Sequence, residues 1–319
     1  MLHPIELKER LRGVIVFAPT PFCRQDKEID FAGFRSNLDY LIQNGIPSIA
    51  IAGFAGEYSA LTPREYSDLV KAAADVVGGK ANLIAGAGGG MHLACAAARA
   101  AQEGGADCVM TLPPYLVTPS PAGLLEHFRA VAESIQIALM IHSMPGSVLT
   151  PDLVQSLSET PNVIAYKDES GDLRTFDEVV HRVGERLLYV NGKAEMMMSC
   201  YFVAGATSNA SAIGNFDPSL ALAAFQAALA GDYRRVDELL LPKARPWYRL
   251  REKSASYLIP VAKASMELAG LCGGTVRPPL SDISPEDQKN LEVLMDKLGY
   301  RRSRQIPKGK MQTSLKKGI

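Results

Sequence analysis

The segment Val14-Ile15-Val16-Phe17-Ala18-Pro19-Thr20-Pro21-Phe22 decides which fold the sequence predicts. Its first five residues are apolar without interruption, as in a parallel strand that is covered on both faces. A doubly wound, nucleotide-binding sheet would usually continue from its first strand into a glycine-rich turn that holds phosphate. Here the strand runs into two prolines, which cannot form such a turn. The segment therefore favours a closed barrel over an open, doubly wound sheet.

Further apolar runs follow this strand at intervals of about thirty residues, which is the length of a βαβ repeat. The predicted strands are residues 14–18, 48–52, 82–85, 108–112, 138–142, 163–167, 187–191 and 205–209. Between them, helices begin on a capping residue followed by proline, most completely in the capping box Thr62-Pro63-Arg64-Glu65. The same pairing recurs at Ser120, Thr150, Asp217 and Ser284, and Gly299 supplies a helix end. This alternation predicts an α/β fold, a (β/α)8 TIM barrel.

The chain is longer than a barrel of this kind needs after its last strand. Helical patterns cover residues 219–230, 257–271 and 285–298, which predicts a C-terminal helical extension. We therefore expect a barrel over residues 1–230, the extension over residues 231–300, and a basic, disordered tail over residues 301–319.

Charge and cysteine content limit the partners and the compartment. The 34 basic and 34 acidic residues cancel, so nothing in the charge favours nucleic acid or a membrane surface as partner. No apolar stretch is long enough to span a bilayer, and the N-terminus lacks the pattern of a signal peptide. The five cysteines are scattered, which favours buried, reduced thiols. We expect a cytoplasmic protein.

Lys167 is the sharpest candidate for chemistry, because it ends the apolar strand at residues 163–167. Active sites of barrels lie at the carboxyl ends of the strands. Burial of an amine there favours its neutral, nucleophilic form, which condenses with a ketone to an iminium that draws electrons from the adjacent carbon. On position alone, Lys167 could equally be a solvated lysine that begins a loop.

Other strand ends carry weaker signals. The segment Gly53-Phe54-Ala55-Gly56-Glu57 could present backbone amides to a carboxylate, or form an ordinary turn. Small residues from Gly205 to Ser211, including Ser208, could leave room and hydroxyls beside a substrate, or relieve crowding. His142 ends the strand next to that of Lys167 and could transfer protons, although a lone histidine is more often structural. Lys193 is a rival amine.

A resemblance decides between these alternatives. From Gly13 to about Leu298 the chain resembles the dihydrodipicolinate synthase and N-acetylneuraminate lyase superfamily of class I aldolases. The motifs that carry the resemblance are short, but their order and spacing are specific. They are Pro19-Thr20-Pro21-Phe22, Gly53 to Glu57 with Leu61-Thr62, Pro113-Pro114-Tyr115, Tyr166-Lys167-Asp168, and Gly270 to Leu280. The resemblance implies a Schiff base on Lys167, no cofactor, and a homo-oligomer, a dimer or a tetramer.

Departures from the family pattern bear on the substrate. Phe54 and Ala55 stand where the synthases carry two threonines, so the hydroxyls are lost and the amides remain. His142-Ser143 stands where most members have Tyr-Asn, the tyrosine being the acid–base group. The synthase arginine that binds a second carboxylate has no counterpart in Gly146-Ser147-Val148-Leu149. A role in lysine biosynthesis is therefore not expected.

Several stretches resemble the 5-dehydro-4-deoxyglucarate dehydratase branch, among them Glu57 to Thr62, Leu112 to Val117 and Ser211 to Phe216. That branch joins dehydration to decarboxylation of a deoxy-keto sugar diacid, without a metal. The resemblance implies a lyase, aldolase or dehydratase, for a small 2-keto acid. Lys167 and His142 would be catalytic, and the substrate-binding residues would be Phe54, Ala55, Gly56, Tyr115, Ser208 and Ser211.

Two other classes of function compete with this one. The missing tyrosine and threonines would also fit a catalytically impaired barrel that binds a keto acid without turning it over. A metal-dependent lyase would need acids and histidines clustered at strand ends, and only His142 qualifies. We therefore expect no metal.

Overall fold

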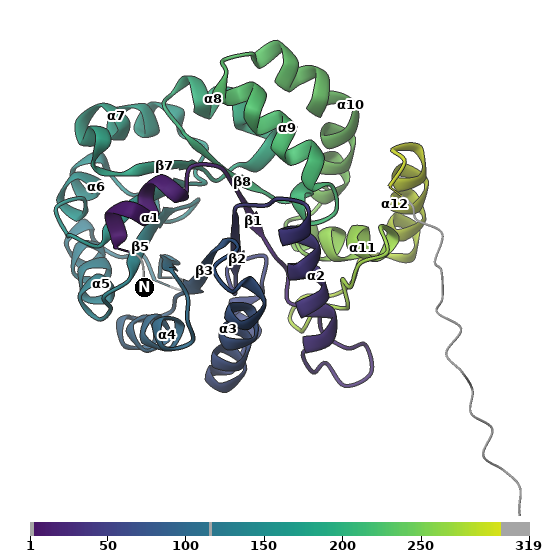
Figure 1. The fold of residues 1–319 in the computed structure, drawn as a ribbon, viewed down its shortest axis with the longest axis horizontal. Helices are drawn as coiled ribbons and strands as arrows, with labels where there is room; N and C mark the ends of the chain where they lie inside the picture. Colours follow the sequence, from purple (N-terminus) through teal and green to yellow (C-terminus); the bar gives the residue numbers. More distant parts are fainter. Residues whose placement is uncertain (1–2, 115–116, 301–319) are drawn as a thin grey trace, which may run out of the picture.

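A closed barrel of eight parallel strands forms the centre of the computed structural model, which describes residues 3–114 and 117–300 (Figure 1). Each strand pairs with the next, and the last pairs with the first. The strands are β1 (Val14–Phe17), β2 (Ser48–Ile51), β3 (Asn82–Ala87), β4 (Cys108–Thr111), β5 (Ala138–Ser143), β6 (Val163–Asp168), β7 (Leu188–Asn191) and β8 (Ser208–Ser211). The predicted (β/α)8 TIM barrel is confirmed.

Helices surround the barrel and cover the outer face of its strands (Figure 1). They are α2 (Phe31–Gln43), α3 (Pro63–Val77), α4 (Met91–Glu103), α5 (Pro121–Glu133), α6 (Pro151–Leu157), α7 (Leu173–Val183), α8 (Met198–Val203) and α9 (Pro218–Leu229). Short 3₁₀ turns are η1 (Tyr58–Ala60), η2 (Gly184–Arg186), η3 (Ala194–Met197), η4 (Ile213–Asn215) and η5 (Ala255–Tyr257). The capping box at Thr62 and Glu65 is confirmed, as are the predicted side-chain caps at the other four helix starts.

The eighth strand differs from the prediction. It covers Ser208–Ser211 rather than residues 205–209. Gly205 has a φ of 101°, in the left-handed region that favours glycine, and it belongs to the turn that follows α8. Because the residues here are all small, the sequence pattern does not mark where this turn ends and the strand begins. As a result, Ser208 lies at the amino end of the strand, and Ser211 lies at the carboxyl end.

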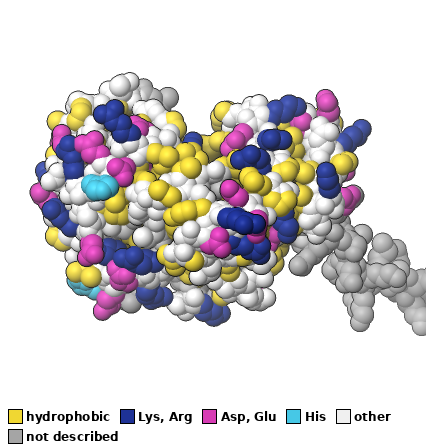
Figure 2. Space-filling view, turned by 90° about the horizontal axis from the view of Figure 1, so that it is seen from above, with side chains coloured by type: hydrophobic (Ala, Val, Ile, Leu, Met, Phe, Trp, Pro, Cys, Tyr) yellow, Lys and Arg dark blue, Asp and Glu magenta, His cyan; other side chains and the backbone are white. Residues whose placement is uncertain are grey.

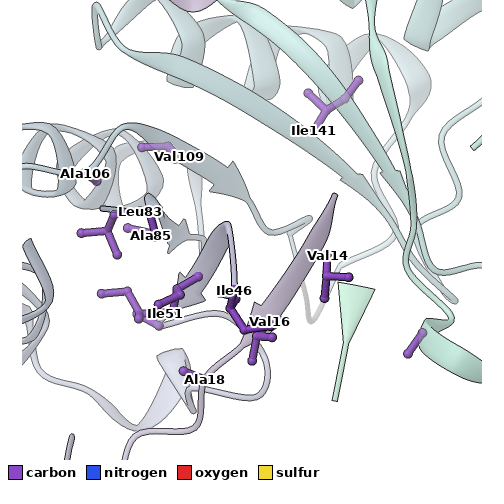
Figure 3. Packing of buried hydrophobic residues seen from close by; sticks show 14 of the residues in the cluster. Val14, Val16, Ala18, Ile46, Ile51, Leu83, Ala85, Ala106, Val109 and Ile141 are labelled. Carbon is purple, nitrogen blue, oxygen red and sulfur yellow. The ribbon is translucent and has the colours of Figure 1, made fainter. Parts of the chain in front are cut away.

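Apolar side chains pack both outside and inside the barrel. The larger cluster fills the layer between strands and helices, and Figure 3 shows part of it, including Val16 of β1, Ile51 of β2 and Leu83 of β3. A smaller cluster fills the barrel interior. Leu7 and Leu11, on and just after the unpredicted helix α1 (Pro4–Arg10), join that interior cluster. The amino end of the barrel is therefore closed, and access is from the carboxyl end.

The predicted helical extension is present after the barrel. It contains α10 (Tyr233–Arg251), α11 (Pro260–Leu268) and α12 (Pro285–Lys297), which lie together on one side of the barrel (Figure 1). The sequence patterns did not predict α10, because Pro242 and Pro246 lie inside it and proline removes a helical hydrogen bond. The tail predicted over residues 301–319 lies outside the described residues.

Surface and cysteine features follow the composition only in part. Figure 2 shows basic and acidic side chains interspersed on one face, as the charge balance predicts. All five cysteines are free, but the expected burial holds only for Cys95 and Cys108, since Cys23 and Cys272 are half-buried and Cys200 is exposed. No helix in the described part of the chain is long and apolar enough to cross a membrane.

Candidate active site

A cavity of about 160 Å³ opens at the carboxyl ends of the strands. Strand ends supply most of its wall, and the loop after β2 and helices α10 and α11 supply the rest. The residues that line the cavity include Phe17, Phe54, Ala55, His142, Lys167, Glu169, Lys193, Ser211, Tyr248 and Arg251. This is where a TIM barrel holds its active site.

Lys167 lies at the base of the cavity in a cluster of polar side chains. It is a cross-strand neighbour of His142, since the two residues are register partners on β6 and β5. The Lys167 Nζ atom lies 2.8 Å from His142 Nε2 and 2.6 Å from Glu169 Oε2. His142 Nε2 lies 3.1 Å from the same Glu169 oxygen. The three side chains therefore share one set of hydrogen bonds.

Charges inside the cluster depend on one another. Burial, and then the positive charge of Lys167, lower the pKa of His142 to about 4, so the imidazole is neutral near pH 7. Burial alone would raise the pKa of Glu169, but the charge of Lys167 and hydrogen bonds from His142 and Lys167 hold it below its ordinary value. The resting site therefore contains a Lys167–Glu169 ion pair beside a neutral histidine.

The second ring nitrogen of His142 has no hydrogen-bond partner among the described residues, although it is buried. A neutral imidazole carries its proton on one nitrogen only. When Nε2 accepts from the Lys167 ammonium, Nδ1 carries the proton without an acceptor. When Nε2 carries the proton, it can donate to Glu169, and Nδ1 is left as a bare acceptor. His142 can therefore change tautomer when Lys167 changes charge, with both working contacts made through Nε2.

The loop after β2 shapes one wall of the cavity. Phe54 and Ala55 line it, as predicted from the motif. Gly56 does not line the cavity: a side chain there would come within 2.6 Å of the backbone nitrogen of Ala52, and its carbonyl accepts from the Thr20 hydroxyl at 2.7 Å. The glycine permits a tight turn here, and its contact with the substrate stays a prediction.

Glu57 anchors the same loop to the C-terminal extension. Its carboxylate accepts from Lys263 Nζ, and both side chains are buried. The Arg277 backbone amide donates to the other carboxylate oxygen at 3.0 Å. The Arg277 guanidinium also forms a two-bond ion pair with Glu65 at 3.0 and 2.5 Å. The late motif from Gly270 to Leu280 thus holds the cavity wall in place from outside.

The two serines predicted to contact the substrate, Ser208 and Ser211, lie at opposite ends of β8. Ser208 donates to the Leu11 carbonyl at 3.0 Å, at the closed end of the barrel, and it does not line the cavity. This position does not favour the predicted contact with the substrate, because β8 begins at Ser208 rather than ends there. Ser211 does line the cavity. Tyr115 lies outside the described residues.

A buried carboxylate lies behind Ser211. The hydroxyls of Ser211 and Tyr248 both donate to Glu195, which is buried in η3, after β7. Burial, and then the charge of Glu195, raise the pKa of Tyr248 above its ordinary value. Both hydroxyl protons are therefore engaged away from the cavity.

Two more cations lie at the cavity. Lys193 follows β7 and is only half-buried, whereas Lys167 is fully buried. Arg251, at the end of α10, donates from Nε to the Leu258 carbonyl at 2.9 Å and packs against the Trp247 and Tyr248 rings. Neither Lys193 nor Arg251 forms an ion pair with any residue that the structure describes. Both charges are thus available to an anionic ligand.

Sequence reasoning missed Glu169 and Arg251. Glu169 lies two residues after Lys167, and residues two apart on a strand point to the same side. That spacing from Lys167 could have found it. Arg251 had no such signal, because the helix that presents it was itself not predicted.

Comparisons with known proteins point to one family. The sequence profile of the Dihydrodipicolinate synthetase family matches residues 10–298. A probable 5-dehydro-4-deoxyglucarate dehydratase from Leptothrix cholodnii is 38% identical over 304 residues, which are 93% of this chain and 99% of the relative.

Solved structures agree with this result. Dihydrodipicolinate synthase from Oceanobacillus iheyensis has a TM-score of 0.89 at 27% identity, over 93% of this chain and 99% of that one. A prophage protein of the dihydrodipicolinic acid synthase family from E. coli K12, solved in complex with pyruvate, has a TM-score of 0.80 at 25% identity. That match covers 91% of this chain and 99% of the other.

Proposed function

The chain belongs to the dihydrodipicolinate synthetase family, and on that premise we propose that it is a dehydratase for 5-dehydro-4-deoxyglucarate that works through an imine on Lys167. The family and the lyase class that the motifs predicted are confirmed. The observation that carries the proposal is the buried Lys167 amine at the cavity base, in contact with His142 and Glu169. Lys193 lacks both the burial and these two contacts.

The substrate has features that an imine can exploit. It is a six-carbon chain with a carboxylate at each end and a keto group beside one of them. A methylene and then two hydroxyl-bearing carbons follow the keto group. Attack by Lys167 on the keto carbon expels water and leaves an iminium, which acidifies the methylene. Loss of a methylene proton and of the neighbouring hydroxyl releases a second water and extends the conjugation.

Decarboxylation follows from that conjugation. The bond to the distal carboxylate breaks, and its electron pair moves through the new double bond toward the iminium nitrogen. Hydrolysis then frees Lys167. The water used in hydrolysis balances the water lost on imine formation, so the net products are one CO2, one water and a five-carbon keto acid with a terminal aldehyde.

A substrate with two carboxylates needs two anion sites, and the cavity offers both. The backbone beside Ala55 can receive the carboxylate next to the keto group, where the family threonines are absent. The distal carboxylate fits Arg251, whose stem is held by Leu258 and by two aromatic rings. Charge-assisted hydrogen bonds from a guanidinium to a carboxylate are among the stronger polar contacts in proteins.

We extend the proposal to a cytoplasmic homo-oligomer, a dimer or a tetramer, as the family resemblance implies. The five free cysteines support a reducing compartment. Light scattering on the purified protein should give a mass that is a multiple of the 34.4 kDa chain. A mass of one chain at all concentrations would refute the assembly.

The test of the function is a product assay. The protein is incubated with 5-dehydro-4-deoxyglucarate, and CO2 and the five-carbon keto aldehyde are followed by NMR. Equal amounts of both products, lost in Lys167→Ala, would support the proposal. Cleavage into two smaller keto or aldehyde fragments would replace the dehydratase by an aldolase. Binding without any product would favour the catalytically impaired barrel.

A further inference from the structure

We propose that Glu169 is the catalytic acid–base of this site and that His142 is a positioning residue. In this assignment Glu169 takes a proton from the carbon next to the imine and returns it to the leaving hydroxyl. His142 holds the Glu169 carboxylate against Lys167. The inference rests on the proposed imine at Lys167, and it replaces the role that the sequence suggested for His142.

Solvent exposure separates the two residues, although both line the cavity. The Glu169 side chain is 32% exposed, whereas the His142 side chain is 2% exposed. The Nε2 atom of His142 is occupied by contacts to Lys167 and Glu169, and its Nδ1 is buried away from any described partner. The imidazole can therefore exchange protons with a substrate only through its two neighbours.

Reach also favours Glu169. Its Oε2 atom lies 2.6 Å from Lys167 Nζ, the atom that becomes the imine nitrogen. The carbon that loses the proton is two bonds from that nitrogen, or about 2.5 Å away by ordinary bond lengths. A carboxylate oxygen 2.6 Å from Nζ therefore lies no more than about 5 Å from that carbon, and it comes within transfer range when both lie on the same side of the imine. The Glu169 backbone amide donates to the Ser143 carbonyl at 2.8 Å, which fixes the residue at the end of β6.

The positive charge beside Glu169 is lost during the reaction, and this loss favours Glu169 as the group that accepts the proton. Beside the cationic iminium, Glu169 stays ionised, as it does beside the Lys167 ammonium. When the proton leaves carbon, the iminium becomes a neutral enamine, and the positive charge that lowers the pKa of Glu169 disappears. The carboxylate therefore becomes a stronger base as the proton arrives. Transfer of that proton to the departing hydroxyl gives water and restores the carboxylate.

Other groups near the cavity are less suited to carry the proton. The hydroxyls of Ser211 and Tyr248 donate to Glu195, so neither is free to receive a proton at carbon. Lys193 forms no hydrogen bond or ion pair with His142, Lys167 or Glu169. Glu169 is the ionised carboxylate in contact with the amine.

The experiment uses pyruvate as the probe, which separates imine formation from proton transfer. Borohydride reduction followed by mass spectrometry measures the imine on Lys167. Exchange of the pyruvate methyl protons in D2O, followed by NMR, measures proton removal from the adjacent carbon. The variants are Glu169→Gln, His142→Gln and Lys167→Ala. Asp172→Asn is the matched control, because it removes a carboxylate from the same loop and asparagine also caps a helix.

We expect Glu169→Gln to trap pyruvate within about threefold of the unmodified protein while its exchange rate falls by about 10²–10⁴-fold. His142→Gln should slow exchange by less than about tenfold. Asp172→Asn should match the unmodified protein in both measurements. Exchange that survives in Glu169→Gln would overturn the proposal, as would an equal loss in His142→Gln with trapping intact.

A second variant covers the case in which Glu169→Gln no longer traps pyruvate. Glu169→Ala leaves room for a small carboxylate, so added formate should restore exchange in it and not in His142→Ala. Failure of formate to restore exchange would overturn the assignment. If the unmodified protein traps no pyruvate and exchanges no protons, the imine itself is refuted and the role of Glu169 falls with it.

Discussion

Replacing Glu65 by glutamine removes one charge from the contact between helix α3 and the C-terminal extension, which supports the wall of the cavity. Glu65 has two roles there. It completes the capping box of α3 with Thr62, and it pairs with Arg277 through two hydrogen bonds. Glutamine also serves in a capping box, so Glu65→Gln keeps the cap and removes the charge together with one of the two acceptor oxygens that face Arg277. The effect of the variant therefore reports on the ion pair.

The magnitude follows from the pKa of Glu65, which hydrogen bonds from Arg277, then hydrogen bonds from Thr62 and the charge of Arg277, lower from 4.5 to about 2. At about 1.4 kcal/mol for each unit, ionisation stabilises the folded state by about 3 kcal/mol at pH 7. Because the folded pKa is depressed, this stabilisation is complete above pH 4.5 and is lost as pH falls through 2. At pH 3.5 the same linkage leaves about 2 kcal/mol. The pair is mostly buried, so solvent screening reduces these values little.

The assay is equilibrium unfolding in urea at pH 7 and pH 3.5, followed by fluorescence. The chain has one tryptophan, Trp247, which is buried on α10 and reports on the extension. Glu133→Gln on α5 is the control, because Glu133 is exposed and has no ion-pair partner in the described part of the chain. A cost below about 1 kcal/mol for Glu65→Gln at pH 7, or a cost that grows at low pH, would refute the reasoning.

Lys263→Met should lower the free energy of unfolding in urea by about 3–5 kcal/mol, because it leaves Glu57 buried and unpaired. Adding Glu57→Gln should restore part of that free energy, and no restoration would contradict the pairing. Arg251→Gln should raise KM for the diacid by about 10- to 100-fold while pyruvate trapping stays unchanged. An unchanged KM would show that Arg251 does not bind the distal carboxylate. Ser208→Ala should cost about 1 kcal/mol of stability with kcat unchanged, since its hydroxyl bonds to backbone at the closed end of the barrel; a large loss of kcat would show that Ser208 acts on the substrate.

The barrel could be predicted because its signals are local and repeated. Uninterrupted apolar strands and cap-proline helix starts are readable one unit at a time, and the structure confirms them. The eighth strand was misplaced because glycine, alanine, threonine and serine from Gly205 onward mark neither a turn nor a strand clearly. Helix α10 was missed because Pro242 and Pro246 interrupt its pattern, while its buried face, which includes Trp247, stabilises it only in the folded chain.

The candidate site could be predicted where one residue carries the signal alone. Lys167 and His142 end their strands, and the barrel brings them within hydrogen-bond distance. The direction of the Glu169 side chain is indicated only by its two-residue spacing from Lys167. The position of Arg251 depends on how a distant helix packs, which no local pattern encodes. The resemblance to the family could not supply them either, because its usual tyrosine is replaced by His142 in this chain.

The central claim is that Lys167 forms an imine with a 2-keto acid, and borohydride trapping tests it most directly. The protein is incubated with pyruvate and borohydride beside Lys167→Ala and Lys193→Ala, and peptides are mapped by mass spectrometry. The account predicts a reduced pyruvate adduct on Lys167 that disappears only in Lys167→Ala. An adduct on Lys193, or no adduct with pyruvate or larger keto acids on the folded protein, would contradict it.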